Sequence, residues 1–205
     1  MRELSDCRLY GIVDLGYVEV ADCSPMARAM IEGGVDIMQL RGKKMSIQAL
    51  VDLAAELHEI TFANSVPLIV NDYPEVAKLV PVEGVHVGQD DAPIAAMDRK
   101  LIVGKSTHSL EQARAAQRAG ADYIGFGPLF ATPTKPNYQP IGLTDIKQVH
   151  VDLTLPIFCI GGIKIDNLAE VIAAGARRVV IVSGLLKTQN VAEYARKCKE
   201  LLCQS

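Results

Sequence analysis

Residues 121–135 read Ala-Asp-Tyr-Ile-Gly-Phe-Gly-Pro-Leu-Phe-Ala-Thr-Pro-Thr-Lys, a short apolar run followed by a polar loop. The run, residues 123–126, directly follows a helix-ending Ala-Gly pair and is too short for a helix, so it predicts a buried strand. Gly127 and Pro128 end that strand, and the loop after them carries the hydroxyls of Thr132 and Thr134 and the ammonium of Lys135. We therefore expect a ligand site at the carboxyl end of this strand.

The rest of the chain alternates in the same way between short apolar runs and helix-like patterns. Strands are predicted at residues 9–13, 37–40, 68–70, 84–87, 101–104, 123–126, 157–160 and 179–182. Helix-like spacing covers residues 25–32, 47–63, 110–119, 143–149, 167–174 and 191–202, and residues 74–79 and 92–97 hold a turn or two at most. This α/β alternation predicts one domain over residues 1–205, a single (β/α)8 TIM barrel. An open doubly wound sheet stays an alternative, because periodicity does not show closure.

The composition limits the class of protein. Hydrophobic residues make up 49% and charged residues 22% of 205 residues, which excludes a disordered chain. A net charge of −3 argues against nucleic acid or an anionic membrane as partner, and no apolar run approaches the roughly 18 residues of a membrane span. The five cysteines are odd in number and lack Cys-x-x-Cys spacing, so neither a disulfide framework nor a zinc site is indicated. We expect a cytoplasmic protein that binds small molecules, and the sequence leaves open whether it is a monomer or a homodimer.

Most short polar clusters follow a predicted strand. They are Gln39, Arg41, Lys43 and Lys44; Asn71 and Asp72; Gln89, Asp90 and Asp91; Ser106, Thr107 and His108; Thr132, Thr134 and Lys135; Gly161 and Gly162; and Ser183 and Gly184. A barrel carries its active site on the loops at the carboxyl ends of its strands. We therefore expect these groups to share one pocket.

The charged groups among them predict a phosphorylated substrate. Asp72 and Asp91 lie on adjacent strand-end loops, where two carboxylates can hold a Mg²⁺ that also binds substrate phosphates. Arg41, Lys43 and Lys135 supply cations from the flanking loops, and a guanidinium can clamp phosphate oxygens in pairs. This part of the rim is predicted to be an anion site with a metal.

A second anion site is predicted after the seventh and eighth strands. Gly161 and Gly162 leave backbone N–H groups unobstructed, and Ser183 follows the eighth strand, where many barrels bind a phosphate monoester. The two glycines could equally form a tight strand-to-helix turn.

Other signals also have structural interpretations. Arg41 and Lys43 taken alone are most often solvated, and Asn71-Asp72 could be a turn. His86 alternates with valines and is predicted to be a packed strand residue. For His108, a role in catalysis competes with a place in the cap or turn of residues 106–109, before the helix that starts at residue 110.

Seven motifs together resemble the thiamine-phosphate synthase family. They are Gln39-Leu-Arg-Gly-Lys43, Asn71-Asp72, Gly84-Val-His-Val-Gly-Gln-Asp-Asp91, Ser106-Thr-His108, Gly125-Phe-Gly-Pro-Leu-Phe-Ala-Thr-Pro-Thr-Lys135, Ile160-Gly-Gly-Ile163 and Val182-Ser183. Each is weak alone, but they follow the family's order and spacing through nearly the whole chain. The resemblance implies a Mg²⁺-dependent transferase of thiamine biosynthesis. It would couple 4-amino-2-methyl-5-pyrimidinylmethyl diphosphate to thiazole ethyl phosphate and release thiamine monophosphate and pyrophosphate.

The resemblance also implies roles for individual residues. The contacts to the pyrimidine diphosphate would be Gln39, Leu40, Arg41, Gly42, Lys43, Asn71, Ser106 and Lys135, with Arg41, Lys43, Ser106 and Lys135 as the catalytic residues. The contacts to the thiazole phosphate would be Thr132, Pro133, Thr134, Gly162, Val182 and Ser183, and the metal ligands Asp72 and Asp91. The chain departs from the family pattern at Tyr73, commonly Arg, at Lys105, usually apolar, and at Gly184, usually Ala.

Two other functions stay open. The sister family of thiazole tautomerases also resembles the chain at Ser106-Thr-His108, where His108 would move a proton, but it needs no site for a metal and a diphosphate. A non-catalytic phosphate-binding barrel would bind the thiazole phosphate without turnover. The acidic pair and Lys135 favour the synthase.

Overall fold

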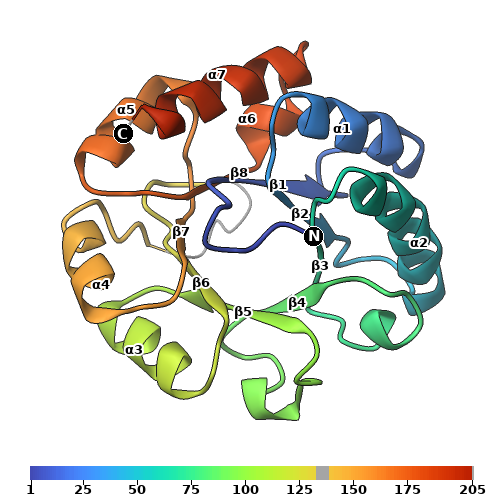
Figure 1. The fold of residues 1–205 in the computed structure, drawn as a ribbon, viewed down its shortest axis with the longest axis horizontal. Helices are drawn as coiled ribbons and strands as arrows, with labels where there is room; N and C mark the ends of the chain where they lie inside the picture. The colour runs from blue at the N-terminus through green and yellow to red at the C-terminus, as the bar shows by residue number, and fades with distance from the viewer. Residues whose placement is uncertain (133–138, 205) are drawn as a thin grey trace.

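Eight parallel strands close into a barrel in chain order (Figure 1). The computed structural model describes residues 1–132 and 139–204. The strands are β1 (Leu9–Asp14), β2 (Ile37–Arg41), β3 (Leu68–Asn71), β4 (Gly84–Val87), β5 (Ile102–Thr107), β6 (Tyr123–Phe126), β7 (Ile157–Cys159) and β8 (Val179–Ile181). Strand β8 pairs with β1 from Leu9–Val179 to Gly11–Ile181, which closes the ring. The predicted (β/α)8 barrel is confirmed, and the open-sheet alternative is wrong.

Helices surround the ring of strands (Figure 1). They are α1 (Val20–Glu32), α2 (Ile47–Ala63), α3 (Leu110–Arg118), α4 (Ile146–Asp152), α5 (Ile165–Ala173), α6 (Ser183–Leu186) and α7 (Val191–Cys203). Only the 3-10 turns η1 (Val76–Lys78) and η2 (Ile94–Ala96) follow β3 and β4, as short as the sequence predicts. None of the helices in the described ranges is long and apolar enough to cross a membrane.

Alternate side chains of each strand enter two separate apolar layers, as a period of two residues requires. Leu9 and Val13 of β1 face the helices. Tyr10, Tyr123 and Phe158 fill the inside of the ring, with their ring centroids 5.3 to 5.9 Å apart. The barrel interior is therefore a packed core.

Residues 1–8 lie across the amino end of the barrel, which faces the viewer in Figure 1. Leu4 and Cys7 pack against the inner layer of side chains. Asp36, just before β2, accepts the backbone N–H groups of Arg8 and Leu9 at 2.8 and 3.0 Å. This segment covers the amino end.

Three boundaries differ from prediction in ways that matter for function. Strand β5 continues to Thr107, so Ser106 lies in a strand rather than in a loop. Helix α4 spans Ile146–Asp152 instead of residues 143–149, which brings His150 into the helix. Helix α1 starts at Val20, more than a turn before Pro25, although proline commonly marks a first turn. The short helix α6 was not predicted.

Candidate active site

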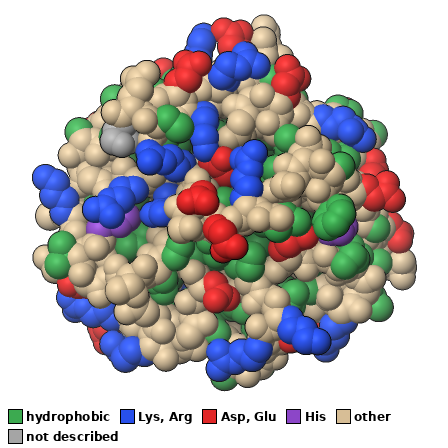
Figure 2. Space-filling view, in the orientation of Figure 1, with side chains coloured by type: hydrophobic (Ala, Val, Ile, Leu, Met, Phe, Trp, Pro, Cys, Tyr) green, Lys and Arg blue, Asp and Glu red, His purple; other side chains and the backbone are tan. Residues whose placement is uncertain are grey.

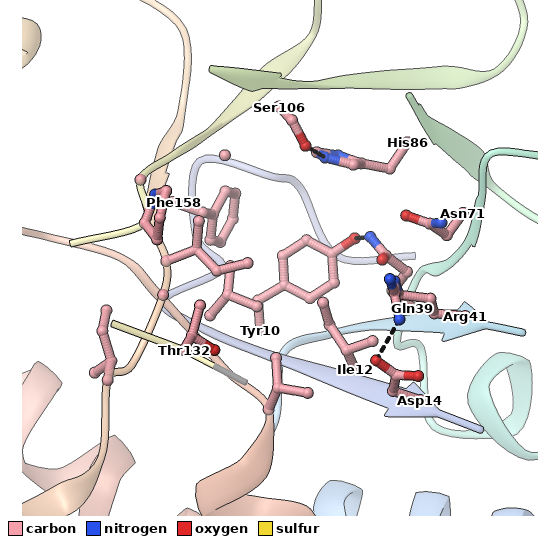
Figure 3. Close-up of a pocket in the computed structure, with 18 of the residues that line it drawn as sticks. Tyr10, Ile12, Asp14, Gln39, Arg41, Asn71, His86, Ser106, Thr132 and Phe158 are labelled. Atoms are coloured by element: carbon pink, nitrogen blue, oxygen red, sulfur yellow. Dashed lines mark hydrogen bonds and ion pairs between the residues drawn. The ribbon is translucent and has the colours of Figure 1, made fainter. Parts of the chain in front are cut away.

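A hollow opens at the carboxyl ends of the strands (Figure 3). Its volume is about 910 Å³, counting the open solvent at its mouth. The residues around it that were predicted to bind substrate are Gln39, Arg41, Asn71, Ser106, Thr132, Gly162, Val182 and Ser183. They belong to β2, β3 and β5 or follow β6, β7 and β8. Closure of the ring thus brings together residues that lie far apart in the sequence.

A chain of hydrogen bonds crosses the floor of the hollow. Gln39 Nε2 donates to Tyr10 Oη at 2.9 Å, and that oxygen lies 2.9 Å from Tyr123 Oη. His86 lies 3.0 Å from Tyr123 Oη through Nδ1 and 3.0 Å from Ser106 Oγ through Nε2. Burial raises the pKa of both tyrosines, so their phenols stay protonated at neutral pH. The chain fixes the positions of Gln39 and Ser106 relative to each other.

His86 is a packed strand residue, as predicted, but it also lines the hollow. Its neighbours Val85 and Val87 belong to an apolar cluster with η2. The side chain between two outward valines must point into the ring. That alternation was the signal that could have placed His86 at the site.

Arg41 is held at the rim of the hollow by a buried carboxylate (Figure 3). Its Nη1 donates to Asp14 Oδ2 at 2.6 Å, and Asp14 is 2% exposed. Asp14 Oδ1 also accepts the N–H of Gly16 at 2.9 Å. Asp14 was not predicted as a site residue, although it is the polar residue at the end of the first strand.

The carboxylates of Asp72 and Asp91 lie beside the hollow, close enough for each to act on the pKa of the other. Gly88 N–H donates to Asp91 Oδ2 at 2.6 Å. Burial, then the hydrogen bond and the charge of Asp91, raise the pKa of Asp72, against the charge of Lys43 with Nζ 3.3 Å from Asp72 Oδ2. Burial also opposes ionisation of Asp91, but the Gly88 N–H, Asp72, Lys43 and Lys105 lower its pKa. Two adjoining carboxylates of this kind favour binding of a cation.

The donor set of this acidic pair fits Mg²⁺. Carboxylate oxygens are its usual ligands, and the ion generally keeps one or two carboxylates together with water and phosphate oxygens. Within residues 1–132 and 139–204, no cluster of three or more His, Cys, Asp and Glu side chains completes a closed protein site. Asp72 and Asp91 therefore could hold the ion and leave positions for a ligand.

Two of the three departures from the family pattern, Tyr73 and Lys105, lie near this acidic pair. Lys105 Nζ donates to Gly88 O at 2.6 Å, so the residue whose N–H binds Asp91 is held at its carbonyl as well. Tyr73 Oη donates to Lys43 O at 3.4 Å. Lys105 thus places one cation near Asp91.

Asn71 has an unused donor at the wall of the hollow. The residue is 7% exposed, and its Nδ2 has no hydrogen-bond partner among the residues that the structure describes. A buried donor of this kind usually has a partner, so an acceptor oxygen from a ligand would satisfy it.

The turn after β7 presents backbone amides. Gly161 and Gly162 have φ values of +100° and +68°, and a Cβ on Gly161 would lie 2.4 Å from Pro128 Cα. Neither glycine N–H donates a backbone hydrogen bond within the described part of the chain. Ser183 starts α6 directly after β8. The arrangement can accept a phosphate.

His108 lines the hollow, and its Nδ1 contacts Gly127 O. The residue that caps α3 is Ser109, whose Oγ accepts the N–H of Gln112 at 3.2 Å. The side chain of His108 is therefore not the cap of this helix.

The other predicted residues do not line the hollow or are not described. The side chain of Leu40 is buried in the outer core layer. Gly42 lies against Leu15 and Leu50, and a Cβ there would approach them to within 2.9 Å. Both residues can offer only backbone groups. Pro133, Thr134 and Lys135 lie outside the described residues.

A (β/α)8 barrel with an acidic pair, a held arginine and open glycine amides at its carboxyl end defines the class of barrel enzymes that act on phosphorylated small molecules. The sequence profile of the thiamine monophosphate synthase family matches residues 9–185. The chain belongs to this family, and the expectation of a transferase of this kind is confirmed.

Individual relatives agree with the family match. A thiamine-phosphate synthase of Chloroflexus aurantiacus is 40% identical over 201 residues, which cover 96% of this chain and 93% of the relative. One from Shouchella clausii is 40% identical over 189 residues and 90% of each chain. A thiamine phosphate pyrophosphorylase from Pyrococcus furiosus superposes with a TM-score of 0.88 at 28% identity over 98% of each chain.

A geranylgeranylglyceryl phosphate synthase from Thermoplasma acidophilum, crystallised with sn-glycerol-1-phosphate, reaches a TM-score of 0.73 over 98% of this chain and 96% of its own. Its sequence identity is only 15%, so it shares the fold alone.

Proposed function

We propose that this protein is a thiamine-phosphate synthase that couples the pyrimidinylmethyl diphosphate to thiazole ethyl phosphate and releases pyrophosphate. The observation that carries the proposal is the pair of neighbouring carboxylates of Asp72 and Asp91, which act on each other beside a hollow that Arg41 and Asn71 line. A diphosphate needs such a combination of a divalent cation, a guanidinium and a neutral donor. Simple proton transfer on a thiazole ring would not need it.

The diphosphate would lie across the β2, β3 and β4 ends of the barrel. Arg41 and Lys43 would bind its oxygens, with Lys135 from the loop after β6. Asn71 Nδ2, which has no partner in the described residues, would donate to another oxygen. Mg²⁺ bound by Asp72 and Asp91 would supply neutralisation of the charge on the leaving pyrophosphate.

The pyrimidine ring would lie over the floor of the hollow, with Gln39 and Ser106 as its partners. The tyrosine and histidine chain holds these two side chains from below. When the C–O bond to the diphosphate breaks, its electron pair leaves with pyrophosphate, and the thiazole nitrogen supplies the pair for the new C–N bond. No proton has to be removed, so positioning and electrostatics carry the rate.

The thiazole phosphate would bind at the opposite rim. The amide of Gly162, with Val182 and Ser183 after β8, would surround it, and Thr132, Pro133 and Thr134 would approach from the loop after β6. A Cβ on Gly161 would clash with Pro128 and one on Gly162 with Phe130, so both positions require glycine, and no side chain of their own covers their N–H groups.

The decisive experiment is an assay with both purified substrates that measures thiamine phosphate and pyrophosphate in equal amounts. Asp72→Asn and Asp91→Asn should each lower kcat by about 10²-fold or more at saturating Mg²⁺, since each removes a preorganised group. The exposed neighbour Asp90 supplies the control, because Asp90→Asn should keep the native rate. Near-native turnover in both variants would discard the metal assignment.

The same assay separates the rival activity. His108 lines the hollow, so a thiazole tautomerase is the second candidate. Isomerisation of the thiazole without coupling, abolished in His108→Ala, would replace the synthase proposal. Binding of thiazole phosphate without either reaction would leave a phosphate-binding barrel.

A further inference from the structure

A second hollow lies at the opposite end of the barrel, at the amino ends of β1 and β8. It is lined by Ser5, Arg8, Ile172, Gly175, Ala176, Arg177 and Arg178. Its volume is about 700 Å³, counted in the same way as that of the first hollow. Figure 2 views this end of the molecule and shows Lys and Arg side chains close together to the left of centre, beside a histidine.

Three guanidinium groups line this hollow, and most of their donors are unused. Arg178 Nη2 donates to Ser5 O at 2.7 Å, but its buried Nε has no partner in the described part of the chain. Arg8 Nη1 donates to Leu202 O. Arg177 is exposed and makes no hydrogen bond or ion pair with any residue that the structure describes. Since each arginine has five N–H donors, the group can bind several more acceptor oxygens.

The positive charge here is not neutralised by the lining. No acidic residue is among the residues that line the hollow in the described part of the chain, and Asp6 is the acid whose charge acts on Arg178. Burial, then the charges of Arg177 and Arg8, lower the pKa of Arg178. Burial, then the charges of Arg177 and Arg178, lower the pKa of His150 to about 4. An anion in the hollow would relieve this repulsion.

We propose that this hollow is a binding site for a phosphate group, either inorganic phosphate or a phosphomonoester. The planar fork of a guanidinium matches pairs of phosphate oxygens, and three such groups can surround one anion. The nearby carboxyl end of α5 does not oppose it strongly, because the N–H groups of Gly175 and Ala176 already bind its last carbonyls at 2.8 and 3.2 Å. The site is separate from both phosphates of the proposed reaction, which bind at the other end of the barrel.

Direct localisation is the first test. Crystals grown without sulfate or phosphate are soaked in selenate, and the anomalous signal of selenium is mapped. We expect a peak between Arg8, Arg177 and Arg178, besides any peak at the carboxyl end. A map with no peak among these arginines overturns the proposal.

A binding comparison gives a second, independent test. Inorganic phosphate and glycerol phosphate are each added at constant ionic strength while Tm is followed. Arg177→Gln removes no contact within the described residues, so it should fold, keep the native synthase rate, and show a smaller rise in Tm with phosphate than the native protein. Arg28→Gln, an exposed arginine on α1, should respond like the native protein.

The two ligands distinguish a site for the bare anion from one for a phosphomonoester. If the native protein's rise in Tm exceeds that of Arg177→Gln only with inorganic phosphate, the site binds the bare anion. If the difference is larger with glycerol phosphate, the site binds a phosphomonoester. An equal response of the native protein and Arg177→Gln to both ligands contradicts the proposal.

Discussion

At the scale of single residues, the adjoining carboxylates of Asp72 and Asp91 should make cation binding depend on pH. The pKa of Asp72 is raised by burial and by Asp91, so a proton and a divalent cation compete for the pair. We expect Mg²⁺ affinity to fall as pH is lowered through this raised pKa. Titration with Mn²⁺, followed by electron paramagnetic resonance without substrate, measures it.

Variants of the pair supply the control. Asp72→Asn should lower the affinity and remove most of its pH dependence, whereas Asp90→Asn should change neither. Ionisation of Asp72 changes the folding stability in the opposite direction to that of most carboxylates, whose pKa is lowered by folding. A folded-state pKa above the unfolded value means that ionising Asp72 costs stability, and the cost appears as pH rises through the folded pKa. A Mn²⁺ affinity that stays constant over this pH range would show that a proton and the cation do not compete for the pair.

The glycine turn after β7 allows a second prediction with a matched control. Gly161 and Gly142 both have positive φ, +100° and +70°. A Cβ on Gly161 meets Pro128 Cα at 2.4 Å, while a Cβ on Gly142 meets no described atom within 4 Å. Gly142→Ala should therefore cost only backbone strain, about 1–2 kcal/mol, and Gly161→Ala more than about 3 kcal/mol of unfolding free energy. Urea unfolding of both variants measures the difference, and equal losses would show that the close approach to Pro128 is not what requires glycine.

Residues at strand ends could be predicted because their chemistry and their position are both visible in the sequence. Gln39, Arg41 and Ser106 were found in this way. Tyr10 and Tyr123 could not be, since each reads as an ordinary core aromatic and gains its role only from the oxygen of the other across the closed ring. Pairing across the barrel interior has no local signal.

At the scale of elements, α4 contains a buried histidine that should make stability depend on pH. Within residues 1–132 and 139–204, His150 Nε2 has no hydrogen-bond partner. Burial, then the charges of Arg177 and Arg178, lower the pKa of His150 from 6.5 to about 4. The unfolded chain binds the proton more tightly, so stability is lost as pH falls from the unfolded pKa towards the folded one. His150→Gln should flatten the fall of unfolding free energy between these pH values, measured by urea unfolding. His58→Gln is the comparison, and a fall as steep in His150→Gln as in the native chain would exclude this origin.

The ends of helices and strands were predicted well where the apolar pattern and the capping residue agree. They were predicted less well where contacts with neighbouring elements decide where an element ends. Helix α2 starts and ends as predicted because Ser46 caps a long apolar stripe and accepts the N–H of Ala49 at 3.2 Å. Strand β5 runs three residues further than its apolar run, since its polar end pairs with β6 from Gly104–Tyr123 to Thr107–Phe126. Helix α6 is too short to show a period.

At the scale of the whole molecule, the barrel depends on the joint between its first and last elements. Asp36 lies 4% exposed at the amino end and accepts the N–H groups of Arg8 and Leu9. It also pairs with Arg2 at 2.7 Å and with Lys199 of α7. One carboxylate thus connects the amino-terminal segment, β1 and the last helix, which no local sequence pattern could reveal.

Removing this carboxylate should destabilise the protein far more than removing a surface charge that also pairs with α7. Asp36→Ala leaves the half-buried ammonium of Lys199 and two backbone N–H groups without an acceptor, so we expect a loss of about 3–5 kcal/mol of unfolding free energy. The control is Glu32→Ala, which breaks an exposed pair between α1 and α7, with Arg196 Nη2 3.9 Å from Glu32 Oε1. Such a pair contributes about 0–1 kcal/mol. Urea unfolding at neutral pH compares the two, and similar small losses would mean that the apolar layers alone hold the ring closed.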